Sequence, residues 1–148
     1  MKKKISESQS FALAAKELGI KEKGSELRAR HLSFQKLNRP VFALAKRLQA
    51  QGYKILLLSK NTPGQFREAA GRFGLQALFP LINTYYLPFD KQSPRMIRYI
   101  IKKYSLKPEE VVMTDDQDFN LVYPKKIGVS TILYTNITDL KQKLKAVL

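Results

Sequence analysis

The stretch that most constrains the fold is an apolar segment, residues 111–114, that runs directly into two adjacent carboxylates, Asp115 and Asp116. A short apolar run of this kind is typical of a buried strand in a parallel sheet, and ligands of such sheets bind beyond the carboxyl ends of the strands. The two carboxylates therefore stand where a hard cation such as Mg²⁺ could bind. The alternative is that they only cap the following helix, because the helix dipole favours an acidic residue at its N-terminus. One aspartate would suffice for a cap, so the adjacent pair favours a metal or phosphate site.

Further apolar runs alternate with segments of helical periodicity. Residues 54–59, 81–87 and 131–134 have the length and composition of strands. Between them apolar residues recur every three or four positions, and Thr62 followed by a proline marks one helix start. Two short helices are also predicted within residues 6–34. Strands that alternate with helices of about 10–15 residues predict a parallel α/β sheet.

The composition excludes several classes of protein. A chain of 148 residues without cysteine has room for one domain with a small helical appendage, and it has neither disulfides nor thiolate zinc sites. A reducing cytoplasm is the expected location. The lysine-rich residues 1–4 are not followed by the apolar segment of a signal peptide. No run approaches the roughly 18 apolar residues that span a bilayer, so no membrane segment is expected.

The formal net charge of +15 predicts attraction to phosphate-rich partners. The 27 lysines and arginines are spread along the whole chain, although residues 1–60 carry 14 of them against four glutamates. Two interpretations stay open. The charge marks either a lysine-rich solvated exterior or a nucleic-acid-binding surface concentrated in residues 1–60.

Three kinds of polar group follow the predicted strands: the hydroxyl of Ser59, the ammonium of Lys91, and the carboxylates of Asp115 and Asp116. Right-handed crossovers would bring these strand ends to one edge of the sheet. The hydroxyl and nearby backbone N–H groups could then hydrogen-bond a phosphoryl group, while lysine neutralises its charge and a carboxylate-bound metal polarises it. Each signal is weak alone, because Ser59 could be a turn residue and Lys91 a solvated lysine.

These segments resemble the motifs of the haloacid dehalogenase (HAD) superfamily, whose members are chiefly metal-dependent phosphatases. Residues 55–59, an apolar strand ending in serine, look like the second motif of the family. Lys91 looks like the lysine of the third motif, usually Lys-Pro-Asp-Pro, although the sequence here lacks the first proline and the aspartate. Residues 115–120, with two aspartates followed by Asn120, look like the fourth and most specific motif. Residues 5–52 look like the small helical cap of subclass I members, together with the helix that leads into the second motif.

The resemblance implies an α/β fold with a HAD-like Rossmannoid parallel sheet, in which residues 1–37 are a helical cap-like segment and residues 38–148 are the core. It also implies Mg²⁺ as cofactor and a small phosphorylated metabolite as substrate. The implied site residues are Asp115 and Asp116 for the metal, Ser59, Asn61 and Lys91 for the phosphate, and Asn120 as a supporting residue.

The sequence departs from the family at the first motif. HAD phosphatases attack phosphate with an aspartate of an Asp-x-Asp motif after an N-terminal strand, and no apolar run here ends in this way. The core is therefore expected to be truncated and to miss its first, central strand. Unpaired buried edges are costly, which leaves three alternatives. The strands at residues 54–59 and 111–115 would pair with each other, another chain would fill the gap in an oligomer, or the chain is a truncated form of a longer protein. Pro124 is expected to kink the helix after the fourth motif.

Two functions follow from these observations. In the first, the chain is a HAD-like hydrolase of the Mg²⁺-dependent phosphatase type that is inactive as it stands, because the nucleophilic aspartate is absent. In the second, it is a non-catalytic basic scaffold that binds nucleic acid or an acidic partner. Binding of the second kind would be salt-sensitive and would survive Asp115→Asn.

Overall fold

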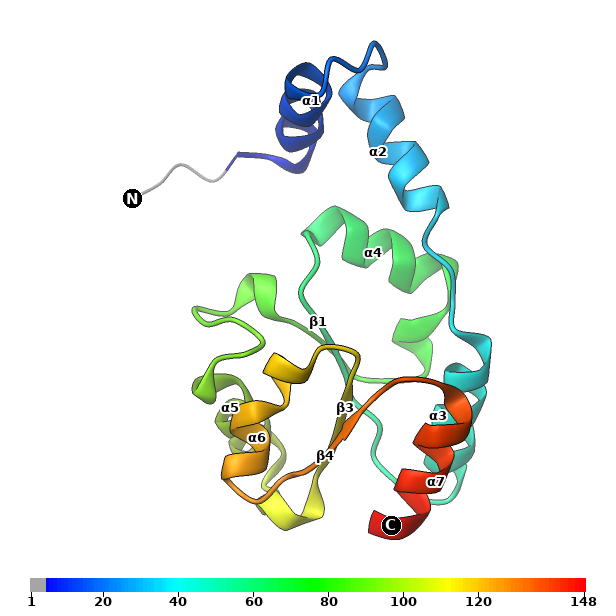
Figure 1. Ribbon diagram of the computed structural model, residues 1–148, viewed down its shortest axis with the longest axis vertical. Coiled ribbons are helices and arrows are strands. Elements are labelled where there is room, and N and C mark those ends of the chain that lie inside the picture. Colours follow the sequence, from blue (N-terminus) through cyan, green and yellow to red (C-terminus); the bar gives the residue numbers. More distant parts are fainter. Residues whose placement is uncertain (1–4) are drawn as a thin grey trace. The chain divides into compact units, whose positions relative to one another are not determined.

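The computed structural model describes residues 5–148, so the interpretation of residues 1–4 as neither a signal peptide nor a strand lies outside the described part. Three helices come first, and strands then alternate with helices (Figure 1). In chain order these elements are α1 (Glu7–Glu17), α2 (Gly24–Ser33), α3 (Arg39–Ala50), β1 (Leu57–Ser59), α4 (Pro63–Arg72), β2 (Leu81–Asn83), α5 (Pro94–Tyr104), β3 (Val112–Asp115), α6 (Val122–Lys126), β4 (Ser130–Leu133) and α7 (Ile137–Val147). Short 3₁₀ turns form η1 (Leu75–Ala77), η2 (Thr84–Tyr86), η3 (Pro108–Glu110) and η4 (Asp118–Asn120).

The α/β class predicted from the sequence is confirmed by two short sheets. Strands β3 and β4 pair in parallel, with Val112 opposite Ser130 and Asp115 opposite Leu133. Strands β1 and β2 form a separate two-stranded sheet. Within the described residues β1 and β3 do not pair with each other, so the alternative in which these two strands close up on each other is wrong. A sheet divided in this way agrees with the prediction that a central strand is missing.

Three predicted elements differ from those observed. The strand expected over residues 54–59 forms only at its end, as β1 (Leu57–Ser59). The strand expected over residues 81–87 ends at Asn83, because the side-chain oxygen of Asn83 accepts a hydrogen bond of 3.1 Å from the backbone N–H of Tyr85 and turns the chain into η2. The expectation that Pro124 lies in the interior of a helix and kinks it is also wrong. Helix α6 begins at Val122, which places the proline in the first turn, where its missing N–H costs no helical hydrogen bond.

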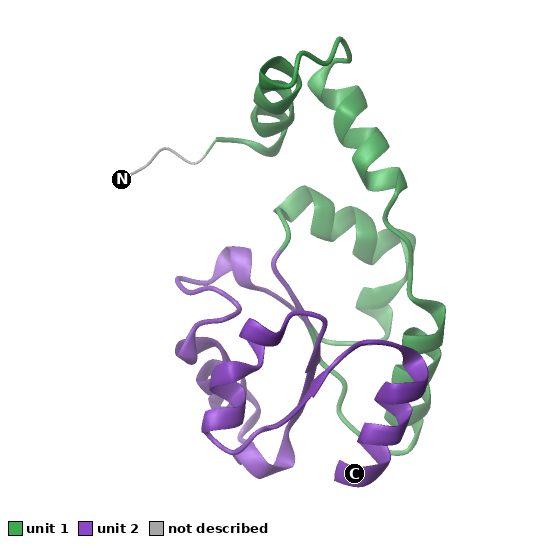
Figure 2. Cartoon of the chain, in the orientation of Figure 1, with its two compact units in different colours: residues 1–57, 61–81 green, residues 58–60, 82–148 purple. Residues whose placement is uncertain are grey.

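The chain forms two compact units, shown in different colours in Figure 2. Unit 1 comprises residues 1–57 and 61–81, of which the first four are not described, and unit 2 comprises residues 58–60 and 82–148. The division runs through both β1 and β2. The assignment of residues 1–37 as a cap-like segment and residues 38–148 as the core concerns their roles, and it stays a prediction.

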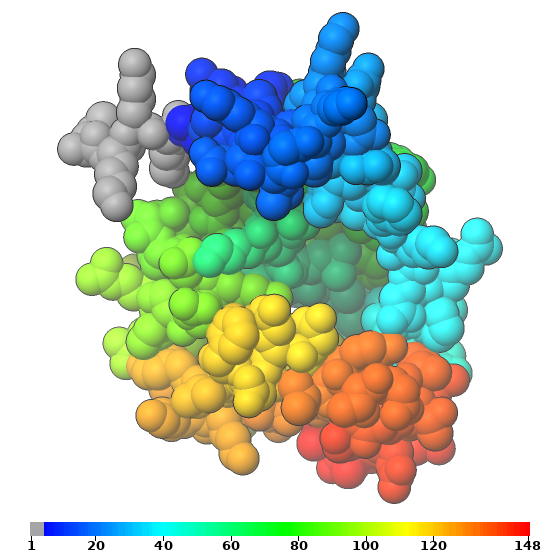
Figure 3. All heavy atoms as spheres, turned by 45° about the horizontal axis from the view of Figure 1, so that its top comes forward, coloured from blue at the N-terminus to red at the C-terminus, as the bar shows by residue number. Residues whose placement is uncertain are grey.

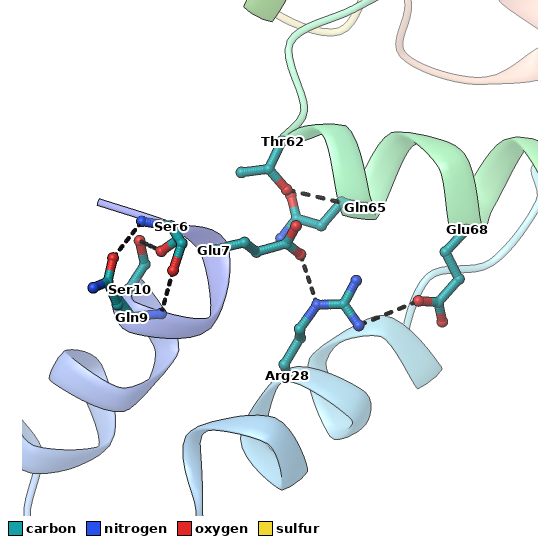
Figure 4. Close-up of polar contacts among 8 residues, drawn as sticks. All are labelled: Ser6, Glu7, Gln9, Ser10, Arg28, Thr62, Gln65 and Glu68. Carbon is teal, nitrogen blue, oxygen red and sulfur yellow. Dashed lines mark hydrogen bonds and ion pairs between the residues drawn. The ribbon is translucent and has the colours of Figure 1, made fainter. Parts of the chain in front are cut away.

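Unit 1 contains a tight helical hairpin of α1 and α2, whose atoms form one contiguous blue group in Figure 3. A Cβ added at Gly24 would lie 2.6 Å from the backbone nitrogen of Ala12, so the close approach of the two helices requires glycine. The Arg28 side chain joins this hairpin to α4 (Figure 4), because its Nε lies 2.8 Å from Glu7 Oε1 and its Nη1 lies 3.4 Å from Glu68 Oε2. The hairpin is thus fixed within unit 1 by packing and by a shared arginine.

In unit 2, α6 and α7 contact β4 of the parallel pair β3 and β4, and α5 packs against α6. The apolar core of the unit consists of Met96, Ile97 and Ile100 of α5, Leu121 and Val129 of the connections, Ile132 of β4 and Leu140 of α7. Burial of such side chains contributes about 1.5–3 kcal/mol each and is the main force that holds the unit together. Across residues 5–148 no helix combines the length and the apolar character that a bilayer crossing needs.

Candidate phosphate-binding site

The centre of the candidate site is Asp115, the last residue of β3. Its side chain is only 2% exposed, and both of its carboxylate oxygens are engaged. Oxygen Oδ2 forms an ion pair of 2.5 Å with Lys91 Nζ. Oxygen Oδ1 accepts hydrogen bonds of 3.0 Å from the backbone N–H of Gln117 and of 3.0 Å from Asn120 Nδ2. Two residues that the sequence places 24 positions apart, Lys91 and Asp115, are therefore in direct contact.

The local sequence explains why the carboxylate of Asp115 turns inward. The backbone carbonyl of Asp115 accepts a hydrogen bond of 2.8 Å from the N–H of Tyr134, which holds the end of β3 against β4. The chain then turns through η4 and brings the buried Asn120 back beneath the strand end. Asn120 Nδ2 also reaches Gln117 Oε1 at 3.3 Å, so the amide donates to both sides of the turn. Neither η4 nor α6 has a side-chain cap, so the aspartates do not serve as helix caps.

The electrostatic environment keeps Asp115 ionised. Burial disfavours its charged form and raises its pKa, but the hydrogen bonds from Lys91, Asn120 and the Gln117 N–H, together with the positive charge of Lys91, outweigh this effect. The net result is that the pKa of Asp115 lies below the ordinary value of 3.8. At neutral pH the site therefore contains a buried carboxylate matched by one ammonium group.

A second ion pair brings the end of β1 to the loop that carries Lys91. Lys60 Nζ lies 3.1 Å from Asp90 Oδ1, which links the residue after Ser59 to the residue before Lys91. Both side chains of this pair are more than half exposed, so the pair adds little to stability. The pair shows that the end of β1 at Ser59 and the loop that carries Lys91 lie close together. Ser59 itself is half-buried and takes part in a polar interaction.

The remaining predicted residues are placed less centrally. Asp116 is exposed beside the buried Asp115. Asn61 is half-buried between β1 and α4 and belongs to unit 1, so its predicted contact with phosphate stays a prediction. Sequence reasoning missed Gln117, whose backbone N–H binds Asp115, and also the pair formed by Lys60 and Asp90. Gln117 lies inside the fourth motif, but a backbone donor carries no side-chain signal that could have identified it.

The residues present do not fit a Mg²⁺ ion held by protein ligands alone. Three donors occupy Asp115, out of roughly four acceptor positions that a carboxylate offers. The Lys91 ammonium at Oδ2 would also repel a cation at that oxygen. In the part of the chain that the structure describes, no three acidic, histidine or cysteine side chains are grouped to hold a metal. Mg²⁺ commonly takes only one or two carboxylates and completes its shell with water and substrate phosphate, and Asp116 remains accessible for that role.

Within this α/β fold a lysine and a buried aspartate meet at the end of a strand, as the sequence motifs predict. The chain matches the model of the haloacid dehalogenase-like hydrolase family over residues 14–121, and it belongs to this family. The family assignment predicted from the sequence motifs is confirmed.

Known proteins of similar sequence and structure agree with this assignment. The mouse (Mus musculus) bifunctional epoxide hydrolase 2 is 25% identical over 128 residues, which is 83% of this chain, and this chain spans 23% of the length of that protein. A hydrolase from Streptococcus pneumoniae TIGR4 superposes with a TM-score of 0.70 at 20% identity, covering 94% of this chain and 89% of the other. A HAD family enzyme from Bacteroides thetaiotaomicron, solved as an aspartate-to-alanine variant with magnesium and inorganic phosphate, gives a TM-score of 0.74 at 17% identity, covering 88% and 71%. These superpositions confirm the HAD-like Rossmannoid fold.

Proposed function

We propose that this chain provides the phosphate-binding part of a Mg²⁺-dependent HAD phosphatase that acts on a small phosphorylated metabolite. The observation that carries the proposal is the contact of Lys91 with the buried, ionised Asp115, which Asn120 holds in place. Asp115 orients the lysine, and the ammonium keeps further N–H donors for a phosphoryl oxygen. Ser59, at the end of β1 next to the Lys60–Asp90 pair, supplies a hydroxyl for the same group. The similar HAD family enzyme from Bacteroides thetaiotaomicron, which was solved with magnesium and inorganic phosphate, supports a phosphate site of this kind.

The cation is proposed to bind together with the phosphoryl group rather than before it. The positive charge of Lys91 already balances Asp115, so a free Mg²⁺ gains little at this carboxylate. A phosphate dianion would add two negative charges beside Lys91 and would offer oxygen ligands to a cation on Asp116. Phosphate affinity should therefore increase when Mg²⁺ is present, and Mg²⁺ affinity should increase by the same factor when phosphate is present.

The nucleophile of a phosphatase is not proposed among the residues of this site. Three donors contact the two oxygens of Asp115 and occupy most of the lone pairs that an attack on phosphorus would use. No apolar run of the sequence ends in the Asp-x-Asp pattern of the first motif. We therefore propose that this chain binds phosphate without hydrolysing phosphate esters on its own.

Calorimetric titration of inorganic phosphate, with and without Mg²⁺, tests the proposal. Lys91→Gln should weaken phosphate binding by about 10-fold or more, because it removes a charged hydrogen bond worth about 1.5–3 kcal/mol. The matched control is Lys60→Gln, which removes the same charge from the exposed pair with Asp90 and should change the affinity by less than about 3-fold. Equal effects of the two substitutions would overturn the assignment of the site.

A second measurement addresses hydrolysis. Release of phosphate from p-nitrophenyl phosphate should not exceed the rate without protein, whether or not Mg²⁺ is added. Turnover that Lys91→Gln abolishes would contradict the part of the proposal that denies this chain a nucleophile, while leaving the phosphate site in place.

A further inference from the structure

The helices α5 and α6 carry a concentration of positive charge without any acidic residue of their own. Their segments, residues 94–104 and 122–126, contain six lysines and arginines and no aspartate or glutamate. All six side chains belong to exposed residues: Arg95, Arg98, Lys102, Lys103, Lys125 and Lys126. We call this set the α5/α6 basic face. Within residues 5–148 none of the six forms an ion pair.

The basic helix α2 differs in this respect. In α2, Arg28 pairs with Glu7 and Glu68, and Arg30 pairs with Glu22 at 2.8 Å. The surplus of positive charge that the sequence places in residues 1–60 is thus partly neutralised where it is folded. On α5 and α6 the six cations are exposed and form no ion pair with the described residues, so their charge attracts a polyanion more strongly than the paired charge of α2 does.

The two helices form one continuous surface. They pack against each other in unit 2 and lie side by side in Figure 1. The guanidinium carbon of Arg98 on α5 lies 5.6 Å from the ring centre of Tyr123 on α6. The opposite side of α5 buries Met96, Ile97 and Ile100, which fixes the cations outward. From Arg95 to Lys102 the stripe extends for about 10 Å along the helix.

Aromatic rings lie between these cations. Tyr99, Tyr104 and Tyr123 are each half-buried. Lys103 Nζ lies 5.6 Å from the ring centre of Tyr99 and 5.7 Å from that of Tyr104. Cations that track a phosphate backbone, with aromatic rings on which bases stack, are the two features of sites that bind single-stranded nucleic acid without sequence preference.

We propose that the α5/α6 basic face binds the phosphate backbone of a single-stranded nucleic acid, independently of sequence. An anionic membrane surface is the weaker match to the same charge, because a helix that lies in a bilayer interface needs a free apolar face. The apolar face of α5 is already buried in the interior of unit 2. This activity is separate from the proposed phosphate site, since the hydrogen bonds and the ion pair of Asp115 come from Lys91, Gln117 and Asn120 and from none of the six cations.

The test measures binding of a fluorescent oligonucleotide of about 16 nucleotides, near the upper site size of such modules, by anisotropy over a range of salt concentrations. Six phosphate contacts predict a slope of log K against log salt of about −4, or a loss of affinity of about 300-fold between roughly 50 and 200 mM salt. The triple variant Arg95→Gln, Lys102→Gln, Lys126→Gln should reduce the slope to about −2, which corresponds to a loss of about 20-fold over the same range.

The control variant removes the same net charge from other helices. Lys16 of α1 and Lys141 and Lys145 of α7 are exposed, and Lys16→Gln, Lys141→Gln, Lys145→Gln should keep the slope near that of the unchanged protein. Replacing Lys102 and Lys126 by arginine should preserve binding, and thermal unfolding should show that all variants are folded. The proposal is overturned if both triple variants lose binding equally, if the unchanged protein does not bind at low salt, or if vesicles of anionic lipid bind the same face more tightly than the oligonucleotide does.

Discussion

Replacement of Lys91 by methionine tests how the candidate site is held together. The substitution keeps most of the apolar side chain and removes the ammonium that contacts Asp115 Oδ2. It leaves the carboxylate buried and supported only by Gln117 N–H and Asn120. Breaking a buried ion pair by removing one partner costs about 3–5 kcal/mol. Because the Lys91 side chain is 20% exposed, solvent screens part of this interaction, and we expect a loss of about 2–3 kcal/mol at pH 7.

The dependence of this loss on pH follows from the lowered pKa of Asp115. A carboxylate with a lower pKa in the folded than in the unfolded state stabilises the fold above its unfolded value, and this contribution is lost as the pH falls through the folded value. In Lys91→Met burial remains while the main opposing interaction is gone, so the pKa of Asp115 should rise. The two proteins should therefore differ most at neutral pH and should converge as the pH falls below 3.8, the ordinary value of an aspartate.

Unfolding by urea, followed by circular dichroism at several pH values, measures both effects. Lys60→Met is the matched control, since it breaks the exposed pair with Asp90 and should cost less than about 1 kcal/mol. If Lys91→Met costs no more than Lys60→Met at pH 7, or if its cost does not decrease at low pH, the description of Asp115 as a buried carboxylate that depends on Lys91 is wrong.

Two further substitutions test the parts that position the site and the hairpin. Asn120→Ala removes a donor to Asp115 Oδ1 and should lower the free energy of unfolding by about 1–3 kcal/mol in urea, and a loss within the error of measurement would refute the role of Asn120. Gly24→Ala places a Cβ 2.6 Å from the backbone of Ala12 and should lower the free energy of unfolding by about 1–3 kcal/mol through overpacking. Gly71→Ala, in the helix α4 with no atom within 4 Å of the added Cβ, should instead be neutral or stabilise by about 0.5–1 kcal/mol, and thermal unfolding of both variants checks the contrast.

Features that depend only on residues close together along the chain could be predicted from the sequence. The end of β3 at Asp115 follows from an apolar run that stops at a charged residue. The starts of α3 and α4 follow from Asn38 and Thr62, each of which accepts a hydrogen bond from a backbone N–H three residues later. The exception is the segment after Asn83, where a side chain competing for the backbone ended the strand early.

The candidate site could be predicted only as a set of residue types. Lys91 and Asp115 were both identified as site residues, but their direct contact depends on how α5 connects the Lys91 loop to β3. Asp115 and Asp116 look alike in the sequence, and the structure distinguishes them because Asp115 is the last residue of β3 and is buried, whereas Asp116 follows the strand and is exposed. The hydrogen bond from the backbone N–H of Gln117 to Asp115 could not be predicted, because it does not depend on the type of side chain at position 117.

The amino-acid sequence by itself determined the α/β class, the family motifs and the carboxylates at a strand end, because apolar periodicity, capping residues and motif spacing are local properties of the chain. Only the tertiary structure decided which carboxylate is buried, which lysine neutralises it and which cations remain without a partner. The physical reason is that burial and ion pairing depend on distances between residues far apart along the chain, as between Arg28 and Glu68 or between Lys91 and Asp115. The net charge of +15 can be counted from the sequence, whereas only the structure shows that the six cations of α5 and α6 lie together without an ion pair to any described residue.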